Sequence, residues 1–288
     1  MKQLKITDVR IVPGDSGFLI DDGCTAILYD TGFGFTGQQM ADRIQKELGD
    51  RPLNYIFLTH SHYDHALGSV QIARRYPDAK IVAGAYAKTV FEKDSARSVM
   101  RELDRKAALQ CGHAVCEDDA DNLRVDITLQ DGDLLDCGTM RFTAIALPGH
   151  TRCSMGYYLQ EHGLLLGTET LGVYIEKDIY LPSYLVGYRT TMISIRKAIL
   201  LQPNRILVPH YGVLEKDKAL QYLKASEKVA EETAQLILSH LKQRRSQEQI
   251  LELLTRQFYL PEVAPVYPID AFRLNTSIMI RLVEKELI

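Results

Sequence analysis

The stretch Thr59-His60-Ser61-His62-Tyr63-Asp64-His65 holds three imidazoles and one carboxylate within six residues, 60–65. Such groups are costly to bury without partners, whereas neutral imidazole and carboxylate are preferred ligands of divalent transition metals. Alternate residues of an extended loop point the same way, so His60 and His62 can share one ion. Asp64 and His65, at the turn into a following helix, can reach a second ion. The stretch therefore predicts a metal site, and a solvated histidine-rich loop is the less favoured alternative.

Three more candidate ligands follow predicted strands elsewhere in the chain. The metal stretch itself comes directly after the apolar run 53–58, which is typical of a strand buried on both faces. His150 and His210 each stand at the exit of a later strand, and Glu169 follows another. Strand ends in a layered sheet fold converge on one edge, where sites tend to lie. We therefore expect these side chains to join the first cluster.

Composition limits the class of protein and of substrate. Hydrophobic residues make up 46% of the 288 residues and charged residues 25%, which is typical of a globular chain with a substantial core. The 34 Lys and Arg residues are balanced by 37 Asp and Glu, so no basic excess favours nucleic acid or an anionic membrane as partner. No apolar stretch reaches the ~18 residues that span a bilayer. We expect a cytoplasmic protein acting on a small molecule.

The chain changes character near residue 213. Before it, short apolar or β-branched runs alternate with helical segments and with turn residues. After it, small or apolar residues recur at helical spacing over 214–245, and two shorter helices are predicted at 247–257 and 270–287. We predict a catalytic domain at 1–213 and a helical extension at 214–288 that roofs the active site or mediates contacts.

Residues 5–212 resemble the metallo-β-lactamase superfamily. The resemblance rests on His-x-His-x-Asp-His at 60–65, the Gly-His-Thr histidine at 150, an acidic residue at 169 and a strand-end histidine at 210, all in family order. It implies an α+β fold, the four-layer αββα metallo-β-lactamase sandwich, here with a C-terminal helical extension. It also implies two metal ions at one edge of the sandwich.

The same resemblance implies a role for each candidate ligand. Its ligand sets are His60, His62 and His150 for the first ion, and Asp64, His65 and His210 for the second. The position of Glu169 is usually Asp in this family and bridges the two ions, so its longer side chain implies a bridge of altered geometry or unequally occupied metals. Asp30 matches a common family Asp and is expected to orient a ligand histidine through its other ring nitrogen, with turn capping as the alternative.

Four further residues are candidate substrate contacts. Arg152 replaces the family's usual Pro and can present a guanidinium to a carboxylate or phosphate, or be a plain surface residue. Tyr184 and Tyr188 lie in the long loop after Glu169, and Tyr211 follows His210. Ordinary loop packing is the alternative for the tyrosines.

The predicted chemistry is hydrolysis. Two divalent ions, zinc by expectation with iron or manganese as alternatives, lower the pKa of a shared water and provide a bridging hydroxide at neutral pH. Asp64 or a metal-bound water would then protonate the leaving group. The expected substrate has an ester-like bond: a lactone, a thioester or a small phosphodiester.

Two other classes stay open. One is a metal-bearing regulatory or binding protein with weak hydrolase activity, whose tail serves as a partner or homodimer surface. The other is a mononuclear iron sulfur dioxygenase of the same fold.

Overall fold

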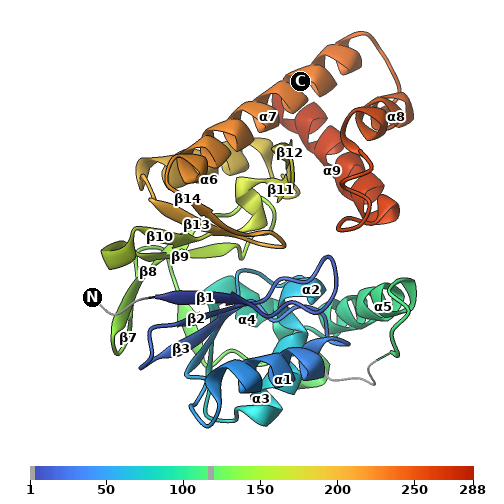
Figure 1. Ribbon diagram of the computed structural model, residues 1–288. Helices are drawn as coiled ribbons and strands as arrows, with labels where there is room; N and C mark the ends of the chain where they lie inside the picture. The colour runs from blue at the N-terminus through green and yellow to red at the C-terminus, as the bar shows by residue number, and fades with distance from the viewer. Residues whose placement is uncertain (1–3, 116–119) are drawn as a thin grey trace. The chain divides into compact units, whose positions relative to one another are not determined.

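The computed structural model describes residues 4–115 and 120–288 (Figure 1). The chain forms two compact units. The first unit comprises residues 1–146 and 155–160, and the second comprises residues 147–154 and 161–288. Among the described helices, none is both long enough and apolar enough to cross a membrane.

The first unit contains a mixed sheet with helices between its strands. The strands follow the chain order: β1 (Lys5–Asp8), β2 (Phe18–Asp21), β3 (Ala26–Tyr29), β4 (Tyr55–Phe57), β5 (Lys80–Gly84) and β6 (Ile127–Leu129). β1 to β3 pair antiparallel, whereas β3 to β6 pair parallel. The helices are α1 (Gly37–Leu48), α2 (Tyr63–Ala66), α3 (Gly68–Arg75), α4 (Ala85–Phe91) and α5 (Asp94–Gln110). Parallel pairing places the exits of β3 and β4 at the same edge of the sheet.

An antiparallel ribbon completes the core of the first unit. It consists of β7 (Leu134–Cys137), β8 (Met140–Ala146) and β9 (Met155–Leu159). Phe57 of β4 lies with its ring centroid 4.6 Å from that of Tyr157 and 5.1 Å from that of Phe142. The Tyr157 hydroxyl donates to the carbonyl of Leu58 at 2.7 Å. The end of β4, from which the metal-ligand stretch begins, is therefore packed and hydrogen-bonded in place.

The second unit combines strands with the C-terminal helices. β10 (Leu164–Leu166) pairs parallel with β13 (Arg205–Val208), which pairs antiparallel with β14 (Gly212–Glu215). A hairpin of β11 (Val173–Ile175) and β12 (Ile179–Leu181) lies before α6 (Tyr188–Leu200). The remaining helices are α7 (Asp217–Lys242), α8 (Gln247–Phe258) and α9 (Ile269–Leu287).

The C-terminal helices form as their sequence pattern predicts. The apolar stripe of α7 is buried, with Ala230, Ala234 and Ile237 at most 1% exposed. α8 begins with a capping box in which Ser246 and Gln249 satisfy each other's backbone N–H groups. The compact unit that contains these helices also contains residues 161–213. The division into domains at residue 213 stays a prediction.

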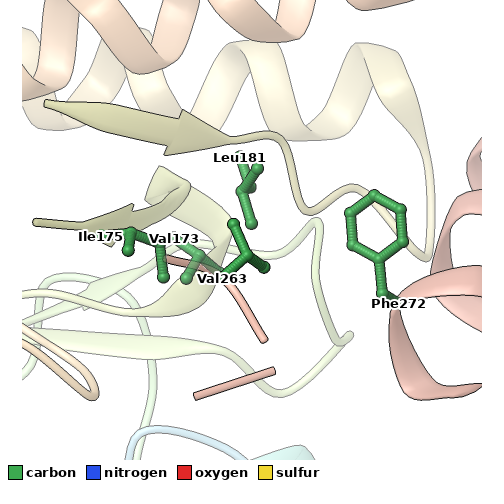
Figure 2. Close-up of a cluster of buried hydrophobic side chains, with 5 residues drawn as sticks. All are labelled: Val173, Ile175, Leu181, Val263 and Phe272. Carbon is green, nitrogen blue, oxygen red and sulfur yellow. The ribbon is translucent and has the colours of Figure 1, made fainter. Parts of the chain in front are cut away.

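A hydrophobic cluster joins the hairpin to the last helices within the second unit (Figure 2). It unites Val173, Ile175 and Leu181 of the hairpin with Val263 and with Phe272 of α9. Because the cluster contains residues from both segments, we expect the hairpin and α9 to unfold together.

Truncating the aromatic side chain of this cluster should lower the free energy of unfolding substantially. Phe272 is 5% exposed, and we expect Phe272→Ala to lower the free energy of unfolding by about 3 to 5 kcal/mol through lost burial and a residual cavity. Leu274 on the same helix is 58% exposed and provides the matched control, with an expected loss below about 1 kcal/mol for Leu274→Ala. Denaturant titration of both variants measures the difference, and equal losses would contradict the cluster's role.

Candidate metal centre

In the first unit, the loop after β4 brings four candidate ligands together. The ring centroid of His60 lies 4.5 Å from that of His62 and 4.1 Å from that of His65. Asp64 Oδ2 lies 3.6 Å from His65 Nε2. The extended backbone of His62 (φ −77°, ψ 153°) leads directly into α2, which carries Asp64 and His65. His60 and His65 are fully buried.

Asp30, which directly follows β3, holds this loop through hydrogen bonds. Its carboxylate accepts from the Thr59 backbone N–H at 2.8 Å, from the Thr59 hydroxyl at 3.0 Å and from the Ser16 hydroxyl at 3.0 Å. The fourth partner is His65 Nδ1, at 2.8 Å from Oδ2. A carboxylate accepts hydrogen bonds, so Nδ1 is the ring nitrogen that donates here and Nε2 remains for another partner. This contact is the one that the expected orienting role requires, and the role itself stays a prediction.

The second unit brings the other three candidate ligands together. His150 lies in the loop between β8 and β9, Glu169 begins a short 3-10 helix, η3 (Glu169–Leu171), and His210 lies in the turn between β13 and β14. Glu169 Oε2 is 2.8 Å from His150 Nε2, and Oε1 is 3.5 Å from His210 Nε2. Each carboxylate oxygen of Glu169 therefore faces a different imidazole.

The backbone around His150 and His210 is specialised for these positions. Gly149 has φ +154°, and an added Cβ there would lie 2.3 Å from Thr191 Oγ1 and 2.6 Å from Thr170 Cγ2, so only glycine fits. The Thr170 hydroxyl accepts the backbone N–H of His150 at 3.0 Å. His210 itself has φ +62°, a left-handed conformation that costs energy for a residue with a side chain.

Ser183 is a contact that the sequence reasoning missed. Its Oγ lies 2.7 Å from His150 Nδ1, and the side chain is 5% exposed. This contact makes Nε2 the nitrogen of His150 that faces Glu169. The two residues are 33 positions apart and no motif joins them, so no signal in the sequence connects them.

The candidate substrate contacts occupy different environments. Tyr184 is completely buried, its hydroxyl has no hydrogen-bond partner among the described residues, and its ring lies 5.6 Å from that of Tyr188. The ring of Tyr211 stands perpendicular to that of Tyr174 at 4.4 Å. Arg152 is exposed. Their contacts with a substrate stay predictions.

Two buried carboxylates hold the loop that follows Asp30. Asp15 is fully buried and accepts from the Phe33 backbone N–H at 3.1 Å and from the Thr36 hydroxyl at 3.0 Å. Asp104 of α5 is 5% exposed and accepts from the Gly34 backbone N–H at 2.8 Å. Burial raises the pKa of Asp104 to about 6, against the opposing effect of its backbone hydrogen bonds. Burial also raises the pKa of Asp15.

The comparisons with known proteins identify the family. The family model of the metallo-β-lactamase superfamily matches residues 12–210. The chain therefore belongs to this superfamily, and the predicted α+β metallo-β-lactamase fold with C-terminal helices is confirmed.

Several relatives are similar over different shares of their length. A metallo-β-lactamase fold-containing protein of Sulfurisphaera tokodaii is 25% identical over 201 residues, which is 69% of either chain. Its crystal structure superposes over 98% of both chains, with a TM-score of 0.62 and 17% identity. The structure of a metallo-β-lactamase family protein of Thermus thermophilus superposes over 98% of this chain and 93% of that protein, with a TM-score of 0.63 and 17% identity. A hydroxyacylglutathione hydrolase of Ectopseudomonas mendocina is 32% identical over 43% of this chain, and the match spans 35% of that hydrolase.

The buried carboxylate of Asp104 predicts a pH-dependent stability. Its folded-state pKa of about 6 lies above the ordinary value of 3.8, so the native state binds the proton more tightly than the unfolded chain does. This group therefore lowers stability as pH rises from about 4 through 6. We expect Asp104→Asn to be about 1 to 3 kcal/mol more stable than the parent at pH 7.5, with the difference shrinking toward pH 4.

Denaturant titrations at pH 4.5, 6 and 7.5 measure this trend. Asp50→Asn, at an exposed aspartate, is the control and should show no such trend. A stability difference for Asp104→Asn that does not vary with pH would contradict the prediction.

The Ser183 contact predicts a role in metal affinity. Ser183→Ala removes the partner of His150 Nδ1, so that neither tautomer nor ring orientation is held. Zinc affinity, measured by competition with a chelator, should fall by about 10- to 100-fold. Ser277→Ala is the control, because this partly exposed serine of α9 donates only to the carbonyl of Leu274 in its own helix. Equal affinities for the two variants would contradict this role.

Proposed function

We propose that this protein is a dinuclear metal-dependent hydrolase that cleaves an ester-like bond in a small molecule. The observation that carries the proposal is the placement of Glu169, whose two carboxylate oxygens face the Nε2 atoms of His150 and His210. A carboxylate between two imidazoles from different loops is the arrangement expected of a bridging ligand.

The chemistry of the donor set fits divalent transition ions. The imidazoles use Nδ1 toward groups of the chain itself: His65 toward Asp30 at 2.8 Å, and His150 toward Ser183 at 2.7 Å. His60 Nδ1 lies 3.0 Å from the Thr59 hydroxyl. Metal-binding histidines have such a partner on the second ring nitrogen, which fixes their tautomer and orientation. This pattern supports Nε2 as the ligand atom of all three.

The proposed assignment of ligands is supported by the family order and by these contacts. Each of the seven side chains offers one ligand atom. We assign His60, His62 and His150 to a first ion, and Asp64, His65 and His210 to a second, with Glu169 bridging. A set of imidazoles and carboxylates favours zinc, and iron or manganese would also accept it.

Bound divalent ions lower the pKa of a coordinated water toward neutrality and polarise the carbonyl or phosphoryl oxygen under attack. The chain's own residues do the rest. Asp30 and Ser183 keep two imidazoles in place, and Asp64, which is partly exposed, passes a proton to the leaving group. Arg152, Tyr184, Tyr188 and Tyr211 are the proposed substrate contacts.

The expected substrate is a lactone, a thioester or a small phosphodiester in the cytoplasm. A relative named as a hydroxyacylglutathione hydrolase supports hydrolysis of an acyl compound. The net charge of −3 supports a small molecule over nucleic acid. The helices of 214–288 would roof the pocket, since α7 packs against η3, which carries Glu169.

Metal content and turnover test this proposal together. Protein stripped of metal and reloaded with zinc should hold two ions per chain and hydrolyse generic esters or thioesters, and a chelator should abolish turnover. At most one ion in fully loaded protein would overturn the dinuclear centre. Two ions without turnover would favour the regulatory or binding class, and oxygen consumption with a persulfide would favour the dioxygenase.

Variants of Glu169 test the bridge directly. Glu169→Gln removes one anionic ligand, so affinity for the second ion should fall by about 10- to 100-fold or more. Glu169→Asp restores the family residue but shortens a ligand in a site built around the longer side chain, so turnover should also fall. Glu161→Gln, at an exposed position, is the control. If both Glu169 variants bind two metals and turn over at the parent rate, the bridging role is wrong.

A further inference from the structure

Four rings of the first unit lie together beside the metal-ligand loop. Phe33 and Phe35 stack with centroids 4.9 Å apart and an interplanar angle of 22°. The ring of Tyr63 lies 5.7 Å from Phe33, and that of His113 lies 5.4 Å from Phe35. We call these four residues the aromatic platform.

The platform is continuous with the candidate metal ligands. Tyr63 stands between His62 and Asp64 in the chain and begins α2. The loop that carries Phe33 and Phe35 is also hydrogen-bonded to the metal loop, because the backbone N–H and the hydroxyl of Thr31 both donate to the carbonyl of His65, at 2.9 and 2.7 Å. The platform and the loop of candidate ligands are therefore joined through Tyr63 and through the two hydrogen bonds of Thr31.

The platform is partly open to solvent. Phe35, Tyr63 and His113 are each partly exposed, whereas Phe33 is 6% exposed and packs beneath them. Aromatic rings held in this way offer a large apolar surface at low cost in conformational entropy.

Two buried carboxylates accept hydrogen bonds from the loop of the platform. Asp15 accepts the N–H of Phe33 and Asp104 accepts that of Gly34, so one carboxylate binds on each side of the short turn. The turn is tightly packed at Gly34, because an added Cβ would lie 3.0 Å from Asp104 Oδ2 and that carboxylate would have to give way. Burying a carboxylate lowers the free energy of unfolding. Proteins retain such destabilising groups where function requires a loop to keep one conformation.

We propose that the aromatic platform binds the apolar acyl group of the substrate, so that the protein prefers esters or thioesters whose acyl group has several carbon atoms. This inference rests on the proposed hydrolase function. In the reaction, the oxygen of water bonds to the acyl carbon, the acyl–oxygen or acyl–sulfur bond breaks, and a proton from water passes to the leaving alcohol or thiol. The platform contributes contact with the carbon chain, and Asp104 acts as a positioning residue for it.

Paired substrates with one leaving group test this proposal in zinc-loaded full-length protein. The ratio of kcat/KM for 4-nitrophenyl hexanoate to that for 4-nitrophenyl acetate measures recognition of the chain. Phe35→Ala should lower this ratio by about 5- to 10-fold, as expected for losing one wall against a few methylenes. Phe35→Leu should restore part of it. Tyr86→Ala removes an aromatic ring that is 42% exposed on α4 and should leave the ratio at the parent value.

A binding measurement separates failure of this inference from failure of the hydrolase proposal. Hexanoate and phenylacetate, the alkyl and aryl arms, should shift the ring signals of Phe35 and Tyr63 in NMR spectra, whereas acetate should not. If neither ester turns over but both apolar acids shift these rings, the hydrolase function fails and the platform stands. An unchanged ratio in Phe35→Ala, or apolar acids that bind Phe35→Ala as tightly as the parent, would overturn the platform.

Discussion

One buried carboxylate connects the parts of the first unit that matter for the site. Through four hydrogen bonds of 2.8 to 3.0 Å, Asp30 joins Ser16, 14 residues before it, to Thr59 and His65, which are 29 and 35 residues after it. Its backbone has φ +53°, a left-handed conformation that a side chain other than glycine adopts at a cost. Surrounding contacts must over-determine such a residue for it to persist. The side chain of Asp30 therefore links the exit of β3, the exit of β4 and the start of α2.

The second unit solves the same problem with different groups. It positions His150 through Ser183 on Nδ1 and Thr170 on the backbone, and it places His210 by a left-handed turn between two paired strands. η3 begins with Glu169, and its C-cap residue is Gly172. The Tyr222 hydroxyl of α7 donates to the carbonyl of Gly172 at 2.6 Å and so holds this end of η3. The C-terminal helices thus contribute to the placement of Glu169 as well as to the core. In both units, an oxygen of the chain contacts Nδ1 of an imidazole, and Nε2 is the nitrogen that we propose as the metal ligand.

What could be predicted from the sequence follows from local periodicity and from the spacing of motifs. The apolar run before His60 and the helical stripe of α7 are local patterns, and the four candidate ligands of 60–65 are close in sequence. Contacts that depend on tertiary structure left no such trace. Asp104 is 70 residues from Gly34, and nothing in the composition of α5 distinguishes it from the other charged residues there. Tyr184 likewise reads as a loop aromatic, yet its ring is completely buried, because hydrophobic packing of a loop depends on what faces it.

The hydrogen bonds of Thr31 connect the proposed aromatic platform with the loop of candidate ligands. Asp30 holds the side chain of His65, and the next residue, Thr31, holds the carbonyl of His65 through two donors. The platform begins two residues further on, at Phe33, and is clamped there by Asp15. A displacement of the platform would therefore also displace the backbone of His65, to which Thr31 is hydrogen-bonded. A rigid platform would serve both proposed roles, since it would offer a preformed apolar surface and hold His65 in the orientation proposed for a metal ligand. The two buried carboxylates that accept hydrogen bonds from this short loop fit such a requirement.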